Sequence, residues 1–69
     1  MPSTVVRDFS YDSAKRVLDI TFQSGRKYHY YNVPRRISEG MREARSKGEY
    51  FNAFIRDHFR WSVDVESLI

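Results

Sequence analysis

The stretch SKGEYFNAFIRDHF at residues 46–59 decides the fold of this chain. Ser46 stands three residues before Glu49, which is the spacing of a capping box at the start of a helix. Apolar side chains then recur at intervals of three and four residues, which is typical of a helix with one buried face. That face is formed by Phe51, Ile55 and Phe59. The pattern therefore predicts an amphipathic helix that needs a second layer to cover it.

The polar side of this predicted helix is expected to meet a partner. It carries Lys47, Asn52, Arg56 and Arg60. Gly48 costs roughly 1 kcal/mol relative to Ala in a helix, so either close packing or a ligand near the helix start requires it. The unpaired N–H groups of a helix start suit a phosphate, and Lys47 adds a positive charge there. A simple capped helix, with its glycine fitted against a sheet, is an equal alternative.

Three short segments in the first half of the chain alternate between apolar and polar side chains, which is typical of half-buried strands. We expect strands over residues 5–11, 17–22 and 26–31, joined by turns around Asp12 and Gly25. Such short connections predict an antiparallel meander.

The faces of these strands follow from the same alternation. In the first segment Phe9 and Tyr11 face one way, and Val6 faces the other. In the second segment the inward side chains are Leu18, Ile20 and Phe22. In the third segment one face carries Tyr28 and Tyr30, and the opposite face carries His29 and Tyr31.

A second helix is predicted between the last of these strands and Ser46. Pro34 suits a first helical turn, where its missing N–H has no partner anyway, and Asn32 is a better cap than Val33. The helix is expected to end near Arg45, with an apolar face of Ile37, Met41 and Ala44. The predicted fold class is α+β, a three-stranded antiparallel meander followed by two helices packed on one sheet face.

The residues after Trp61 alternate only weakly. We expect either a short fourth strand at the C-terminus or a loosely held end. An ordered contact at Trp61 followed by a mobile remainder is the favoured interpretation. The chain, residues 1–69, is predicted to be one domain with a core at about 3–60 and a tail at 61–69.

Composition excludes several classes of protein. The chain has 69 residues, a net charge of +3, two histidines and no cysteine, so disulfides and thiolate metal sites are excluded. No apolar run approaches the roughly 20 residues that span a membrane, and the start of the chain has no signal-peptide character. We therefore expect a cytoplasmic protein without a cofactor, either a monomer or a weak dimer paired through an edge strand.

Several short motifs of the chain resemble the KTSC domain. They are Tyr28-His29-Tyr30, Asn32-Val33-Pro34, Ser46-Lys47-Gly48, Tyr50-Phe51-Asn52 and Ile55-Arg56. Within them, we assign structural roles to Tyr28, Tyr30, Pro34, Ser46, Tyr50, Phe51 and Ile55. That family is named for its occurrence at the C-terminus of some lysyl-tRNA synthetases, and it also occurs as free-standing small bacterial and phage proteins. The resemblance therefore implies RNA as a partner.

Aromatic side chains on a sheet face can stack bases, as in proteins that read single-stranded RNA. Tyr28 and Tyr30 share the face that carries Leu18, so packing in the core is the favoured interpretation for them. His29 and Tyr31 on the other face are the more exposed candidates. A basic surface is a further candidate, formed by Arg35, Arg36, Arg42 and Arg45 with Lys47, Arg56 and Arg60, and Arg26 and Lys27 near the second turn could add to it. Glutamates interrupt it, and a solvated, self-compensating helix face is the commoner outcome.

No combination of serine, histidine and acid forms a nucleophile motif, so we predict no enzymatic activity. We predict a small binding module for tRNA, single-stranded RNA or another nucleic acid. Its candidate contacts are Lys47, Gly48, Asn52, Arg56, Arg45, Arg42, His29 and Tyr31. The alternative is a protein–protein interaction module, such as an accessory or phage-borne regulator. An apolar patch around Trp61 would favour that alternative.

Overall fold

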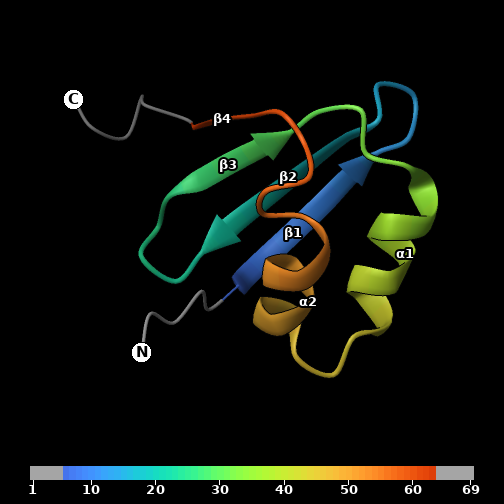
Figure 1. The fold of residues 1–69 in the computed structure, drawn as a ribbon. Coiled ribbons are helices and arrows are strands. Elements are labelled where there is room, and N and C mark those ends of the chain that lie inside the picture. The colour runs from blue at the N-terminus through green and yellow to red at the C-terminus, as the bar shows by residue number, and fades with distance from the viewer. Residues whose placement is uncertain (1–5, 64–69) are drawn as a thin grey trace.

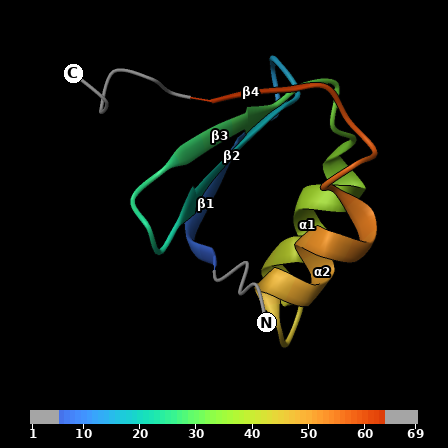
Figure 2. The same ribbon diagram turned by 60° about the vertical axis from the view of Figure 1, so that its left-hand side comes forward.

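The computed structural model describes residues 6–63 of the chain. Four antiparallel strands form one sheet in the order of the sequence, namely β1 (Val6–Asp12), β2 (Val17–Phe22), β3 (Lys27–Tyr30) and β4 (Trp61–Val63). Two helices, α1 (Arg35–Glu43) and α2 (Lys47–Phe54), cover one face of this sheet (Figure 1, Figure 2). The α+β prediction is confirmed, including the short fourth strand. The prediction of a mobile end concerns residues 64–69, which lie outside the described residues.

β1 carries a bulge that strict alternation did not predict. Val6 pairs with Phe22 and Phe9 pairs with Ile20, so two residues of β1 oppose a single residue of β2. The extra residue turns Val6 to the same face as Phe9, where both pack against the core. The prediction that Val6 lies on the opposite face from Phe9 is therefore wrong. Val5 lies outside the described residues.

The turn between β1 and β2 is held by side-chain and backbone hydrogen bonds. Asp12 Oδ1 accepts from the N–H of Ala14 at 3.0 Å and of Lys15 at 3.2 Å, as expected for an aspartate in a turn. The Arg16 carbonyl accepts from the N–H of Val33 at 3.0 Å. The β1–β2 turn is thereby attached to the segment that leads into α1.

α1 starts later and ends earlier than predicted. Its N-cap is Pro34, which provides no side-chain hydrogen bond. Asn32 is not the cap, because its φ of 58° places it in the left-handed region, three residues before the helix begins at Arg35. The helix ends at Glu43 because Ala44 already adopts an extended conformation.

α2 begins as the capping-box spacing predicts. The Ser46 hydroxyl accepts a hydrogen bond from the N–H of Glu49 at 3.2 Å. The helix ends at Phe54, however, and does not continue to Phe59, because Ile55 has left helical geometry with φ −120° and ψ −46°. Phe59 packs against the core from outside the helix and is only partly buried.

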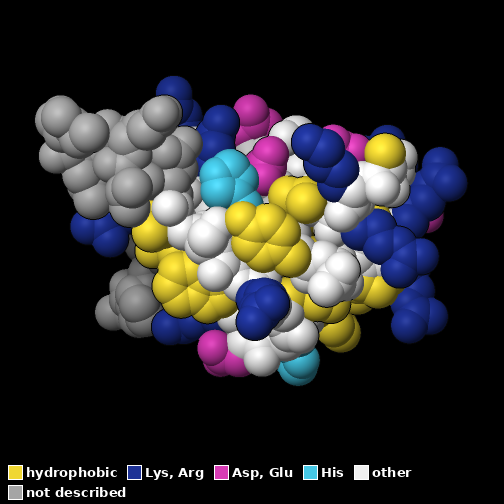
Figure 3. All heavy atoms as spheres, turned by 90° about the horizontal axis from the view of Figure 1, so that it is seen from above, with side chains coloured by type: hydrophobic (Ala, Val, Ile, Leu, Met, Phe, Trp, Pro, Cys, Tyr) yellow, Lys and Arg dark blue, Asp and Glu magenta, His cyan; other side chains and the backbone are white. Residues whose placement is uncertain are grey.

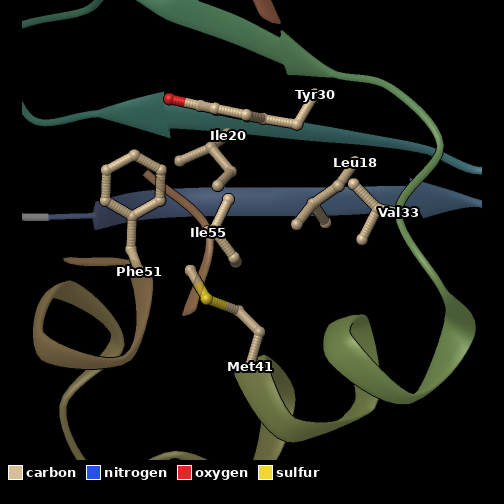
Figure 4. Packing of buried hydrophobic residues seen from close by; sticks show 7 residues of the cluster. All are labelled: Leu18, Ile20, Tyr30, Val33, Met41, Phe51 and Ile55. Carbon is tan, nitrogen blue, oxygen red and sulfur yellow. The ribbon is translucent and has the colours of Figure 1, made fainter. Parts of the chain in front are cut away.

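Seven buried side chains form the core between the sheet and the helices (Figure 4): Leu18, Ile20, Tyr30, Val33, Met41, Phe51 and Ile55. They come from β2, β3, both helices and the segments that follow β3 and α2. Leu18, Ile20 and Tyr30 point toward the helices, as the alternation predicted. Neither described helix is long and apolar enough to cross a membrane.

The two helices meet where Gly40 of α1 faces Tyr50 of α2. The Tyr50 hydroxyl donates to the carbonyl of Ile37 at 2.9 Å. A Cβ added at Gly40 would lie 2.8 Å from Cζ and 3.0 Å from Cε2 of Tyr50, closer than side-chain packing allows. Gly40 therefore weakens α1 locally but allows the Tyr50 ring to contact this helix.

Candidate functional site

An open cleft of about 940 Å³ lies beside the helices on the same face of the sheet. Its walls come from the end of β2, the β2–β3 turn, β3, the start of β4, α2 and the segment that follows α2. Five aromatic side chains line it: Phe22, Tyr28, Tyr30, Phe51 and Trp61. We call it the aromatic cleft. Charged side chains of Arg26, Arg56 and Asp57 complete its lining.

The aromatic rings of the cleft fix one another's positions. The Tyr28 ring lies 5.4 Å from that of Phe22 in an edge-to-face arrangement and 5.3 Å from that of Trp61. Tyr30 stacks on Tyr28 at 6.4 Å, and Phe51 contacts both Phe22 and Tyr30 edge to face. Tyr30 is only 3% exposed, whereas Trp61 is 52% exposed. A buried aromatic cluster thus supports one ring that is open to a ligand.

The charged side chains of the cleft are not paired with one another. Within residues 6–63, the Arg26 and Asp57 side chains form no ion pair and no hydrogen bond. Arg56 Nη1 donates to Asn52 Oδ1 at 3.5 Å, a long contact. The cleft therefore offers two guanidinium groups and one carboxylate to a bound molecule.

The charges of the cleft act on the Tyr30 hydroxyl. Burial, with a smaller contribution from the neighbouring Tyr28, raises the pKa of Tyr30 to about 12. Arg56 lowers this pKa and Asp57 raises it, so both residues lie close enough to influence the phenol. Tyr30 consequently stays uncharged at neutral pH.

The ammonium group of Lys47, which was expected to face a partner, instead forms hydrogen bonds within the protein. Its Nζ donates to the carbonyl of Arg42 at 3.0 Å and to that of Ala44 at 2.8 Å. These carbonyls lie at the C-terminal end of α1, where a cation is favourable. Lys47 thus joins the end of α1 to the start of α2, and Gly48 follows it in the first turn of α2.

The other predicted contacts lie on different surfaces. Arg42 and Arg45 are exposed near the junction of the helices. Asn52 and Arg56 lie four residues apart in the sequence, and their side chains contact each other. Of the contacts predicted from the sequence, it is Arg56 that lines the aromatic cleft. Figure 3 shows one side of the molecule, on which Lys and Arg side chains gather at the right-hand end, over α1 and the β1–β2 turn.

His29 and Tyr31 lie on the opposite face of the sheet, away from Arg56 and Lys47. His29 Nδ1 lies 2.6 Å from Asp19 Oδ1 on the neighbouring strand. The Tyr31 hydroxyl lies 2.6 Å from Ser62 Oγ of β4, the strand on the other side of β3. Both predicted stacking residues therefore have local partners. No group of three His, Asp or Glu side chains among residues 6–63 could hold a metal ion.

Asp57 lines the cleft although no binding role was expected for it from the sequence, whereas Arg26 was expected only as an addition to the basic surface and Trp61 only as part of an apolar patch. Trp61 reaches the cleft because β4 pairs with β3, which places Trp61 opposite Tyr30. One feature of the sequence could have indicated the cleft. The alternation places Phe22 and Tyr28 on the same sheet face, and a tight turn joins the two strands that carry them.

Comparisons with known proteins identify the family. The model of the KTSC domain matches residues 2–59. A lysine–tRNA ligase of Nostoc punctiforme is 40% identical over 58 residues, which are 84% of this chain and 10% of the ligase. An uncharacterized protein of Stutzerimonas stutzeri is 35% identical over 66 residues, which are 93% of each protein.

The fold agrees with these similarities. The crystal structure of a KTSC domain protein from Yersinia pestis has a TM-score of 0.79 at 32% identity, covering 90% of this chain and 87% of that one. This chain spans about a tenth of the length of the lysine–tRNA ligases that it matches. It belongs to the KTSC domain family.

Proposed function

We propose that this KTSC domain is a non-enzymatic module that binds single-stranded RNA in the aromatic cleft. The observation that carries the proposal is the half-exposed Trp61 ring in one cleft with the Arg26 and Arg56 guanidinium groups, neither of which forms an ion pair within residues 6–63. Stacking on an aromatic ring contributes roughly 1–3 kcal/mol per base, and arginines contact the phosphates between bases. The similarity to lysine–tRNA ligases supports RNA as the partner, and a cytoplasmic location belongs to the same proposal.

The proposed contacts differ from those expected from the sequence. We assign base stacking to Trp61 and Tyr28 in place of His29 and Tyr31, which have partners on the opposite face of the sheet. Phosphate contact moves from Lys47, which is bound to α1, to Arg26 beside Arg56.

Protein binding is the second candidate function. Two large apolar side chains are exposed among the described residues, Phe54 at 51% and Trp61 at 52%. A protein partner would bury both rings, whereas the RNA proposal uses Trp61 alone. Phe54→Ala therefore separates the two functions, since it should leave RNA affinity unchanged.

The fluorescence of Trp61 reports on RNA binding, because Trp61 is the chain's single tryptophan. Oligouridine RNA is titrated into the protein over a series of salt concentrations while tryptophan fluorescence is recorded. Stacking should quench the fluorescence, and affinity should fall as salt rises.

Arg26→Ala and Arg56→Ala should each weaken binding and reduce the salt slope by roughly 0.7, the value for one phosphate of a single strand. Arg42→Ala removes an exposed arginine outside the cleft and is the matched control. A folded protein that shows no quenching at low salt would refute the RNA proposal.

A further inference from the structure

We infer that the aromatic cleft selects guanine among the RNA bases, with Asp57 reading the base. This inference rests on the function proposed above. It starts from the carboxylate that lines the cleft beside Arg26 and Arg56.

The Asp57 carboxylate would be unfavourable in a cleft that contacts only phosphates. A carboxylate repels a phosphate and lowers affinity for any nucleic acid that passes it. Asp57 also forms no ion pair within the described part of the chain, so neither arginine of the cleft neutralises it. Water solvates the exposed Asp57 carboxylate in the unbound protein, whereas in a complex this carboxylate favours a ligand that donates hydrogen bonds to it.

Guanine is the base whose edge fits a carboxylate. Its N1–H and N2–H groups are neighbouring parallel donors, which match the two carboxylate oxygens in the way that guanidinium groups do. Adenine and cytosine each place an acceptor nitrogen beside their amino group, and uracil places carbonyls on both sides of its single N–H. These acceptors repel a carboxylate, so only guanine forms the bidentate pair.

The cleft provides the other contacts that such a base needs. The half-exposed Trp61 ring, held against Tyr28 at 5.3 Å, offers a surface for stacking. Arg26 comes from the β2–β3 turn and Arg56 from the segment that follows α2, so each can contact a phosphate flanking the base. One base, two phosphates and one carboxylate account for the charges of the cleft.

The test compares five pentanucleotides that carry guanine, adenine, cytosine, uracil or inosine between flanking uridines, with Trp61 fluorescence as the readout. Bidentate recognition corresponds to roughly 5- to 150-fold discrimination, so the guanine oligonucleotide should bind at least about fivefold tighter than the next natural base. Inosine lacks the N2 amino group and should lose most of that advantage.

Asp57→Asn should remove the preference for guanine while leaving general binding intact or tighter, because a negative charge disappears. Glu43→Gln removes an exposed acid outside the cleft and should change neither property. Circular dichroism of each variant verifies that it is folded.

The outcomes separate the two proposals. Equal affinity for all five oligonucleotides overturns guanine selection and leaves RNA binding in place. A guanine preference that survives Asp57→Asn also overturns it, since another residue then reads the base. Absence of quenching by all five oligonucleotides refutes the RNA-binding function itself.

Discussion

At the scale of single residues, Gly40 is the position where one methyl group should matter most. Glycine-to-alanine changes in helices usually stabilise by about 1 kcal/mol. Gly40→Ala should instead lower the free energy of unfolding by about 1–3 kcal/mol, because the new Cβ collides with the Tyr50 ring. Urea denaturation measures this change.

A double-mutant cycle isolates the collision from other effects of Gly40→Ala. In a Tyr50→Ala background the ring is absent, so Gly40→Ala should become neutral or stabilising. Purely additive effects would show that the contact with Tyr50 is not the reason for glycine at this position.

Tyr30 should make the protein sensitive to alkali. The unfolded chain ionises Tyr30 near pH 10, whereas burial holds its pKa in the folded protein at about 12. The unfolded state therefore loses the proton first. The contribution of Tyr30 to stability is complete below pH 10, and the free energy of unfolding falls as pH rises toward 12.

The variant Tyr30→Phe keeps the buried ring and removes the ionisable group. Its free energy of unfolding should decline less steeply than that of the wild type above pH 10, in matched denaturation series. Parallel alkaline profiles would mean that the pKa of Tyr30 differs little between the folded and unfolded states.

At the scale of helices and strands, the junction of α1 and α2 depends on Lys47. Lys47→Met keeps most of the apolar stem and removes the donor to the carbonyls of Arg42 and Ala44. We expect a loss of about 1 kcal/mol in the free energy of unfolding and unchanged affinity for oligouridine. Arg45→Met, at a neighbouring exposed cation, is the control and should change stability little. A loss of RNA affinity in Lys47→Met that Arg45→Met does not share would instead show that Lys47 contacts the RNA.

The boundaries of the elements show what local patterns predict. The start of α2 was predictable because a hydroxyl at Ser46 and a backbone N–H three residues later define the cap. The end was not, because Ile55 is buried as the helical spacing requires although its backbone has already left the helix. Val6 shows the same limit in a strand, since a bulge reverses its face without changing the apolar pattern.

At the scale of the whole molecule, the aromatic cleft could not be read from any one stretch of sequence. Its lining joins residues 22–30, 51–57 and 61, which only the folded sheet and helix bring together. Arg56 was found because it extends a local helix pattern, whereas Trp61 depends on the pairing of β4 with β3. Fold class therefore followed from periodicity, but the site required tertiary structure.

The same architecture predicts uneven stability across the sheet. β4 has three residues at an edge, whereas β2 lies between two strands and contributes Leu18 and Ile20 to the core. Backbone amides of β4 should exchange with solvent faster than those of β2, as measured by NMR. Under the proposed function, saturating RNA should slow exchange in β4, because the bound strand would contact Trp61. Equal protection of β2 and β4 in the unbound protein would contradict this prediction.

The sheet consists of four antiparallel passes in sequence order, and an even number of passes returns the chain to the side from which it came. The start of β1 at Val6 and the end of β4 at Val63 therefore lie at the same end of the sheet as the β2–β3 turn that carries Arg26 (Figure 1). The described strands therefore begin and end beside the part of the aromatic cleft that is lined by Phe22, Gln23, Ser24 and Arg26. Under the function proposed above, the end of the sheet at which β1 begins and β4 ends is thus also an end from which an RNA strand enters the cleft.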